Sequence, residues 1–287
     1  MLTEQNTGLD RNPIDKFYTD AAYADRCVEY FMKYVAIKPD DLIIEPGAGN
    51  GSFIPSIKSR HVNSRFYDIE PEGAEIIQQD YLLLDTTPFA EKNVHVIGNP
   101  PFGRQSSLAI KFIKKSCEFA RSVSFILPKS FKKESMRSKF EKHFHLLFEE
   151  DVPPNSFLVN GNTHDVPCVF QIWNKTTINR KIEEKITPYG FEYVKANTIY
   201  HIAFRRVGAN AGKCYKNNGQ KFSAQSHNFI KLNPAYVCII DNIIEKINNV
   251  TFPSNTLGPR SLSQSEANVV INSIIQSISS LIVVEKM

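Results

Sequence analysis

The sequence has no long apolar run and no secretory leader pattern. A helix that crosses a bilayer needs roughly 20 consecutive apolar residues, and no segment approaches that length. The opening stretch MLTEQNTGLDRNP is polar, without the basic and then apolar plan of a secretory signal. We therefore expect a protein of the cytoplasm or another intracellular compartment, neither secreted nor bound to a membrane, with residues 1–12 forming a flexible N-terminus.

Metal-binding and redox motifs are also missing. The cysteines stand far apart, with no C-x-x-C pair, at Cys27, Cys117, Cys168, Cys214 and Cys238. Cysteines in this arrangement are expected to be small buried apolar residues. His143 and His145 are two residues apart but have no third ligand nearby, so no metal site is predicted. A net charge of +4 permits an anionic partner without requiring one.

Strand-like and helix-like segments alternate through the first 175 residues. A helix is expected to begin near residue 20, capped by Thr19 or Asp20, and apolar strands alternate with helical segments from residue 42 onward. This order predicts an α/β domain over residues 13–175, with a mainly parallel sheet covered on both faces.

The texture changes near residue 175, where Asn and Gly begin to separate short strand-like runs, among them HNFIKL and YVCIIDN. One helix is expected near the end, because Ser263 and Glu266 have the spacing of a capping box. Residues 176–287 are therefore predicted to form a smaller β-rich or α+β domain.

A glycine-rich turn follows the first apolar strand, in the segment LIIEPGAGNG over residues 42–51. Glycines let a backbone adopt positive φ and approach a ligand closely. No Gly-Lys-Ser/Thr follows, so this turn is not a phosphate-binding P-loop. Taken alone, it is equally well explained as a structural turn.

Acidic residues then follow at the ends of successive strand-like segments. Asp68 and Glu70 come about twenty residues after the glycines, where a carboxylate can accept hydrogen bonds from ribose hydroxyls. Asp80 precedes Tyr81 and offers an acceptor for an adenine amino group beside an apolar ring. Each acid alone is more simply a surface residue, but their ordered appearance indicates a nucleoside-like ligand.

The most specific motif is Asn99-Pro100-Pro101-Phe102, directly after the apolar strand VHVIG. Two prolines remove two backbone donors and stiffen the turn, which leaves the Asn side chain and a proline carbonyl as fixed acceptors. An exocyclic amino group has two N–H bonds to donate, and Phe102 offers a face on which an extruded base can stack. The structural alternative is a rigid turn with a core Phe.

Together these motifs resemble the Rossmann-like amino-methyltransferase family, whose N6-adenine members carry an (Asp/Asn/Ser)-Pro-Pro-(Tyr/Phe/Trp) motif. The resemblance implies a seven-stranded, mainly parallel sheet and S-adenosyl-L-methionine as cofactor. It implies catalytic roles for Asn99, Pro100, Pro101 and Phe102. It implies cofactor-binding roles for Tyr18, Thr19, Glu45, Pro46, Gly47, Gly49, Gly51, Asp68, Glu70, Asp80 and Tyr81.

The order of the motifs resembles the subgroup whose target-recognition domain lies at the C-terminus, which implies that role for residues 176–287. Basic candidates for nucleic-acid contact are Lys129, Lys133, Arg205 and Arg206, although a solvated basic surface explains them equally well. Phe157 resembles in placement an aromatic that stacks on the far face of the flipped base, the alternative being a buried loop anchor.

The resulting expectation is an enzyme that methylates adenine N6 in DNA. Three alternatives remain open: the same reaction on RNA, methylation of a protein glutamine, and a catalytically silent nucleic-acid-binding subunit.

Overall fold

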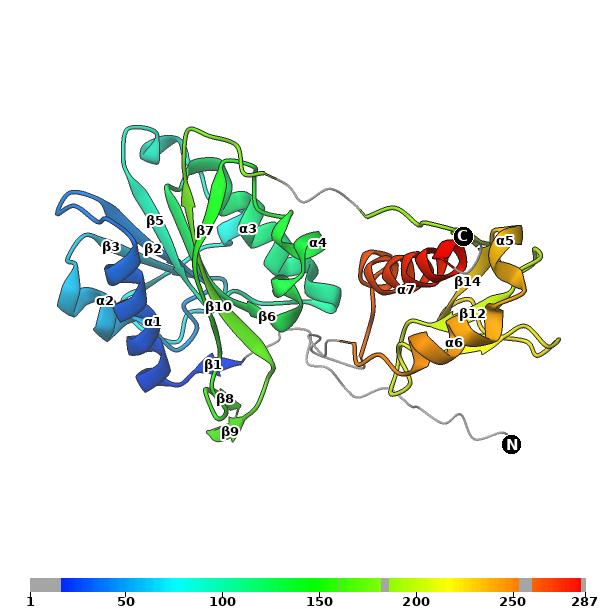
Figure 1. The fold of residues 1–287 in the computed structure, drawn as a ribbon. Helices are drawn as coiled ribbons and strands as arrows, with labels where there is room; N and C mark the ends of the chain where they lie inside the picture. Colours follow the sequence, from blue (N-terminus) through cyan, green and yellow to red (C-terminus); the bar gives the residue numbers. More distant parts are fainter. Residues whose placement is uncertain (1–16, 160, 182–185, 253–259, 285–287) are drawn as a thin grey trace, which may run out of the picture. The chain divides into compact units, whose positions relative to one another are not determined.

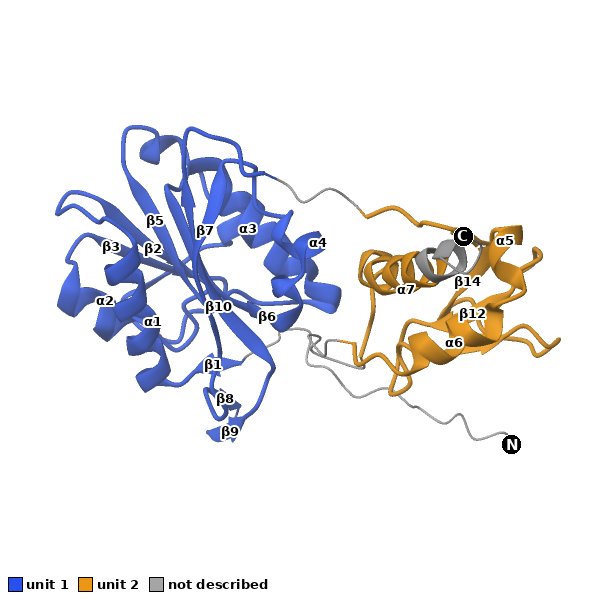
Figure 2. Ribbon diagram, in the orientation of Figure 1, with its two compact units in different colours: residues 1–182 blue, residues 183–287 orange. Residues whose placement is uncertain are grey.

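A computed structural model of the chain describes residues 17–159, 161–181, 186–252 and 260–284. It divides into two compact units, residues 1–182 and 183–287 (Figure 2). The division falls a few residues after the boundary expected near residue 175. Each unit has a hydrophobic core of its own.

The first unit is built on a seven-stranded sheet with the order β4-β3-β2-β5-β6-β10-β7 (Figure 1). Its strands are β2 (Leu42–Pro46), β3 (Ser64–Asp68), β4 (Ile76–Gln78), β5 (Val94–Gly98), β6 (Ser122–Pro128), β7 (Phe144–Asp151) and β10 (Cys168–Lys175). All pairs from β4 to β6 are parallel, and β10 pairs antiparallel with both β6 and β7. The predicted Rossmann-like, mainly parallel sheet is thereby confirmed.

The order of the strands reverses at β2 and β5, and this reversal positions the site. The crossover from β2 to β3 runs through α2 (Ile54–Arg60), and the crossover from β5 to β6 runs through α3 (Ser107–Phe119). Because the two crossovers leave in opposite directions, right-handed connections place their helices on opposite faces. In open sheets of this kind, ligands bind beyond the carboxyl ends of the strands, at the reversal point.

Helix α1 (Ala21–Tyr34) begins where the sequence predicted. Of the two expected caps it uses Asp20, whose carboxylate accepts hydrogen bonds from the N–H groups of Ala22 and Tyr23. The helix buries one apolar stripe against the sheet.

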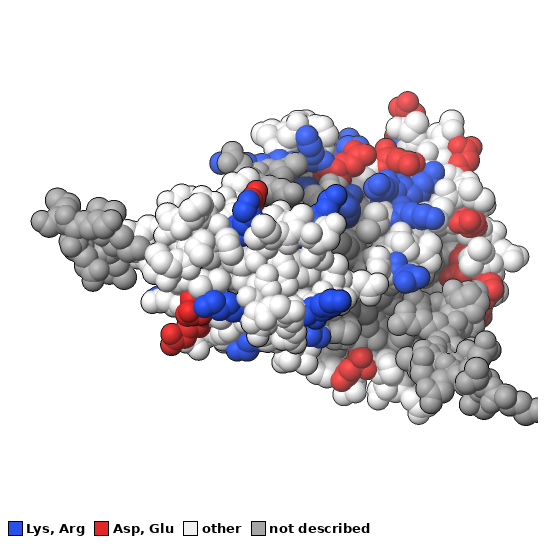
Figure 3. All heavy atoms as spheres, turned by 90° about the vertical axis from the view of Figure 1, so that its right-hand side faces the viewer, with Lys and Arg blue, Asp and Glu red and all other residues white. Residues whose placement is uncertain are grey.

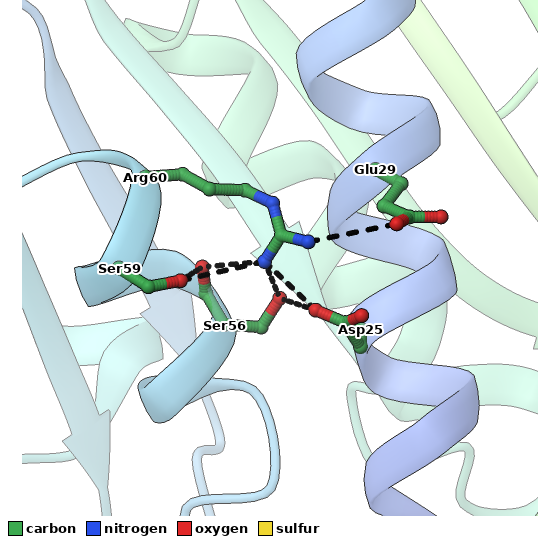
Figure 4. A network of polar contacts seen from close by, with 5 residues as sticks. All are labelled: Asp25, Glu29, Ser56, Ser59 and Arg60. Carbon is green, nitrogen blue, oxygen red and sulfur yellow. Dashed lines mark hydrogen bonds and ion pairs between the residues drawn. The ribbon is translucent and has the colours of Figure 1, made fainter.

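A polar network joins the exposed side of α1 to α2 (Figure 4). Arg60 lies 2.7 Å from an oxygen of Asp25 and 3.6 Å from one of Glu29. Hydrogen bonds from Ser56 and then Arg60 hold the pKa of Asp25 below its ordinary value. The network joins α1 to α2, the helix that follows the glycine-rich turn after β2.

A small second sheet holds the N-terminal part of the described chain. Strand β1 (Tyr18–Thr19) pairs antiparallel with β8 (Phe157–Val159), which pairs with β9 (Asn162–His164). Asp20 adds a backbone hydrogen bond to the carbonyl of Ser156. The segment before α1 is therefore anchored to a hairpin distant in sequence.

The second unit is an α+β fold. Its four-stranded antiparallel sheet has the order β11-β14-β12-β13, with strands β11 (Phe191–Val194), β12 (Ile202–Arg205), β13 (Cys214–Lys216) and β14 (His227–Leu232). Helices α5 (Pro234–Val237), α6 (Ile240–Asn248) and α7 (Gln264–Val284) accompany it.

The strand-like interpretation of YVCIIDN is wrong, because this segment spans the end of α5 and the start of α6. Its isoleucines continue at helical spacing, and Ile240, Ile243 and Ile247 form one buried stripe in the core of the unit.

The predicted capping box is present at the start of α7. The Glu266 carboxylate accepts from the Ser263 N–H at 2.8 Å, and the Glu266 N–H donates to the Ser263 hydroxyl at 3.2 Å. The helix therefore starts at the residue that the sequence indicated.

Four of the five cysteines are buried as expected, whereas Cys238 is exposed. In the described part of the chain, no helix combines the length and the apolar character that crossing a membrane would require.

Candidate functional site

A cavity of about 350 Å³ opens in the first unit, where the order of the strands reverses. Four segments meet there: the glycine-rich turn after β2, the acidic segment after β3, the segment after β4, and the Asn-Pro-Pro-Phe turn after β5. Its walls include Phe17, Tyr18, Gly47, Gly49, Asp68, Glu70, Glu72, Asp80, Tyr81, Leu82, Asn99, Pro100, Pro101, Phe102, Leu108 and Phe112.

The glycine-rich turn exposes its backbone to this cavity. Gly47 and Gly49 have φ values of +70° and +54°, a region that residues with a Cβ rarely adopt. A Cβ on Gly49 would lie 3.1 Å from the Tyr18 ring, so the absent side chain also makes room for that aromatic. The ring thereby covers the turn at the cavity's edge.

Asp68 organises the turn from the neighbouring strand. Its Oδ2 accepts the Gly49 N–H at 2.8 Å, and its Oδ1 accepts the Glu70 N–H at 2.8 Å. Each oxygen of a carboxylate has a second lone-pair direction, so Asp68 retains the capacity to accept ligand hydroxyls.

Further carboxylates line the same wall. Glu70 follows Asp68 at the rim, and Glu72 accepts a hydrogen bond from the Tyr18 hydroxyl. Asp80 caps a short 3₁₀ turn, where its Oδ1 accepts the Leu82 N–H at 2.9 Å. Four carboxylates thus line a largely apolar cavity, an arrangement that favours a positively charged ligand carrying hydroxyl or amino donors.

Glu45, also expected at the cofactor, lies near the end of β2, is 2% exposed and does not line the cavity. Burial, and secondarily the charge of Asp68, raises the pKa of its carboxyl group well above the ordinary value. Its Oε2 has no hydrogen-bond partner among the described residues. Glu45 is therefore a buried acid whose charged form is disfavoured and whose Oε2 is unpaired among the described residues.

The Asn-Pro-Pro-Phe turn forms the opposite wall. Asn99 is half-buried, and its Nδ2 donates to the Phe17 carbonyl at 3.1 Å and to the Thr19 hydroxyl at 3.2 Å. Pro101 packs near Gly47, where a Cβ would stand 3.5 Å from the proline Cδ. The Phe102 ring is 9% exposed and lines the cavity. The turn and the glycine-rich segment therefore face one shared space.

Several residues expected at the cofactor do not reach the cavity. Thr19 is 3% exposed and accepts a hydrogen bond from Asn99, while Pro46 and Gly51 are not among the residues that line the cavity. Tyr81 lines the wall, but its hydroxyl is bonded to Ser116 at 2.8 Å, and burial raises the pKa of that hydroxyl. Tyr81 thus supports the wall from within.

Phe157, expected to stack on a target base, is 1% exposed and lies in the hydrophobic core. As the first residue of β8 it pairs with Thr19, and it does not line the cavity. This geometry corresponds to the buried loop anchor that was the alternative. A ring buried to this extent offers no free face to a base.

Neither basic candidate of the first unit, Lys129 or Lys133, lines the cavity. Lys129 forms an ion pair with Asp151 at 3.0 Å. Lys133 lies between a 3₁₀ turn and the short helix α4 (Glu134–Arg137), outside the cavity wall. Acidic residues of β7 therefore neutralise basic side chains in the segment that contains Lys129: Asp151 pairs with Lys129 and Lys132, and Glu149 pairs with Arg137.

In the second unit, Arg205 donates to the Val207 carbonyl at 3.1 Å and Arg206 to the Gln225 carbonyl at 2.7 Å. On the face shown in Figure 3, Lys and Arg side chains lie between acidic and uncharged ones, without a broad basic field among the described residues. The two arginines therefore hold loops, and a contact with phosphate would be additional to that role.

Eight cavity residues were not among the site residues predicted from the sequence: Phe17, Ile69, Glu72, Gln79, Leu82, Gly103, Leu108 and Phe112. Glu72 had a signal, as the next acid after Asp68 and Glu70. Phe112 lies on the buried face of α3, where its ring stacks on Tyr81 at a centroid distance of 5.2 Å.

No protein-family model matches the chain, and no curated protein matches it. Solved structures share its architecture. They include the 23S rRNA methyltransferase ErmE, with a TM-score of 0.45 and 15% identity over 57% of this chain and 71% of the other. An S-adenosylmethionine-dependent methyltransferase from Anabaena variabilis has a TM-score of 0.40 and 12% identity over 56% and 88%.

A third match is TrmN from Thermus thermophilus, with a TM-score of 0.38 and 14% identity over 54% of this chain and 48% of the other. Similarity at this level assigns no activity, which has to come from the geometry of the site.

Proposed function

We propose that this chain is an S-adenosylmethionine-dependent methyltransferase that modifies the exocyclic amino group of adenine in nucleic acid, with DNA as the favoured substrate. One observation carries the proposal: the Asn-Pro-Pro-Phe turn and the acid-lined glycine turn open into the same cavity.

The residues present fit the cofactor. S-adenosylmethionine would supply an activated methyl group on a cationic sulfonium. The exposed backbone at Gly47 and Gly49 suits close approach of its amino-acid part, and Asp68 or Glu70 suits its ribose hydroxyls. Asp80 retains a carboxylate oxygen for an adenine amino group.

The turn fits an amino group as the methyl acceptor. Asn99 Oδ1 and the Pro100 carbonyl can accept the two N–H bonds of adenine N6, which directs the nitrogen lone pair toward the methyl donor. The Phe102 ring supplies an apolar face for the base. Alignment and stabilisation of the developing positive charge then carry the acceleration, and no strong base is required.

DNA is favoured because a separate α+β unit follows the catalytic unit, the order of the subgroup with a C-terminal target-recognition domain. RNA is the second candidate, since the turn reads an amino group and not the sugar. The experiment below also distinguishes methylation of a protein glutamine and a catalytically silent nucleic-acid-binding subunit.

The test is transfer of a radioactive methyl group from S-adenosylmethionine to duplex DNA, single-stranded DNA, RNA and a protein extract in parallel. We expect label in DNA, and digestion of the DNA to nucleosides should yield labelled N6-methyl-2′-deoxyadenosine. Label only in RNA would favour the second candidate, and label in none with intact cofactor binding would favour the silent subunit.

Asn99→Ala should leave the cofactor dissociation constant within about twofold and reduce turnover at least a hundredfold, by analogy with removal of other transition-state contacts. The matched control is Asn174→Ala. Asn174 pairs with Ser122 at the start of β6, and the cavity lies beyond the opposite ends of the parallel strands. Undiminished methylation by Asn99→Ala would remove Asn99 from the mechanism.

A further inference from the structure

The side chain of Asn99 is held by the segment just before α1. Its Nδ2 donates one hydrogen bond to the Phe17 carbonyl at 3.1 Å and one to the Thr19 hydroxyl at 3.2 Å. A primary amide has two N–H bonds to give, so both are used. The Oδ1 atom has no partner among the described residues, and Asn99 lines the cavity.

The orientation of this amide is chemically determined. A backbone carbonyl can only accept, so the group facing the Phe17 oxygen has to be the NH₂ end of Asn99. The acceptor end is then the one left for a ligand. A flipped amide would set two acceptors against each other and forfeit a hydrogen bond.

The partners of Asn99 are themselves fixed. Thr19 is 3% exposed, and its backbone is paired with Phe157 in the small sheet. On one side Asp20 bonds the Ser156 carbonyl, and on the other the Tyr18 ring packs on Gly49. The hydroxyl of Thr19 cannot follow Asn99 if the amide rotates.

We propose that Thr19, together with the Phe17 carbonyl, is a positioning group that holds Asn99 with Oδ1 toward the target, which selects substrates that donate an N–H. This inference rests on the proposed methyl transfer. It reassigns Thr19, expected from the sequence to contact the cofactor, to the amino-group side of the site. A ring nitrogen without hydrogen would meet the lone pairs of Oδ1 and be rejected.

Thr19→Val separates this role from packing, because valine keeps the shape and the β-branch but removes the acceptor. We expect kcat to fall about tenfold, the effect of losing one orienting hydrogen bond, with the cofactor dissociation constant and the nucleic-acid KM unchanged. Thr19→Ser keeps the hydroxyl and should restore kcat to within about twofold. Unchanged kcat in Thr19→Val, or an equal loss in Thr19→Ser, would overturn the proposal.

A second measurement does not depend on activity. In protein labelled with ¹⁵N-asparagine, the side-chain NH₂ signals of Asn99, assigned by their loss in Asn99→Ser, should show slow exchange with water. One of the two protons should exchange faster in Thr19→Val but not in Thr19→Ser. Identical exchange of these protons in the natural protein, Thr19→Val and Thr19→Ser would refute the proposed orientation of Asn99. Protected signals in a protein that methylates no substrate would refute only the proposed function.

Discussion

At the scale of single residues, the site depends on groups whose surroundings set their chemistry. Glu45 carries a carboxyl group in a place where its charged form is disfavoured, because burial and the nearby charge of Asp68 raise its pKa well above the ordinary value. The folded protein therefore holds this proton more tightly than the unfolded chain does.

This difference predicts a pH dependence of stability. The contribution of Glu45 is fully present below the pKa of the unfolded chain, near 4.5, and is lost as the pH rises through the higher folded-state pKa. Glu45→Gln has no titrating group at this position. We expect the free energy of unfolding of the natural protein to decline relative to that of Glu45→Gln as the pH rises above the unfolded-state value near 4.5.

Urea unfolding of both proteins at several pH values measures this difference, and the other titrating groups cancel in the comparison. Parallel stability curves would show that Glu45 ionises normally. Addition of S-adenosylmethionine should reduce the decline in the free energy of unfolding if the bound cation favours the ionised form of Glu45.

At the scale of elements, the start of α7 shows how few residues determine a helix end. Ser263→Ala removes the hydroxyl that accepts the Glu266 N–H and frees one of the donors of the first turn. We expect a loss of about 1 kcal/mol in the stability of the second unit. Ser265→Ala, in the same turn but outside the Ser263–Glu266 capping box, is the matched control and should change stability by less than about 0.5 kcal/mol.

Hydrogen exchange of the amides in α7 reports this change directly. Faster exchange in Ser263→Ala than in Ser265→Ala is the expected result. Equal exchange in the two variants would mean that the Ser263 hydroxyl does not stabilise the start of α7.

Elements defined by local patterns could be predicted from the sequence. Helix α1 with its Asp20 cap, the parallel strands and the capping box of α7 all follow from periodicity and short motifs. YVCIIDN was interpreted wrongly because a short run of β-branched and aromatic residues has strand propensity, whereas burial in the core of the second unit selects a helix.

Contacts between distant segments could not be predicted in the same way. The Asn-Pro-Pro-Phe turn and the glycine turn were found because each is a contiguous motif. The role of Thr19 depends on its pairing with Phe157 and its bond to Asn99, which only the folded chain brings together. The same pairing places Phe157 in the small sheet, where its side chain is buried in the core and does not line the cavity.

At the scale of the whole molecule, two hydrophobic cores share no residue. The described residues that line the cavity all belong to the first unit. The single tryptophan, Trp173, is 1% exposed and belongs to the first core, where it stacks on Phe140 at 4.2 Å. Its fluorescence therefore reports the unfolding of the first unit alone.

Ile243→Ala tests whether the two units are independent. Ile243 is fully buried in the second core, so the truncation should cost about 2 to 5 kcal/mol there. The far-UV circular dichroism transition of the second unit should move to lower urea, while the Trp173 fluorescence transition and the cofactor dissociation constant stay unchanged. If the second unit selects the target, methyl transfer to nucleic acid should fall under conditions in which that unit unfolds, although cofactor binding persists. A matching shift of the Trp173 transition would show instead that the two cores unfold as one cooperative structure, because a local loss in one core can reach the other only through such coupling.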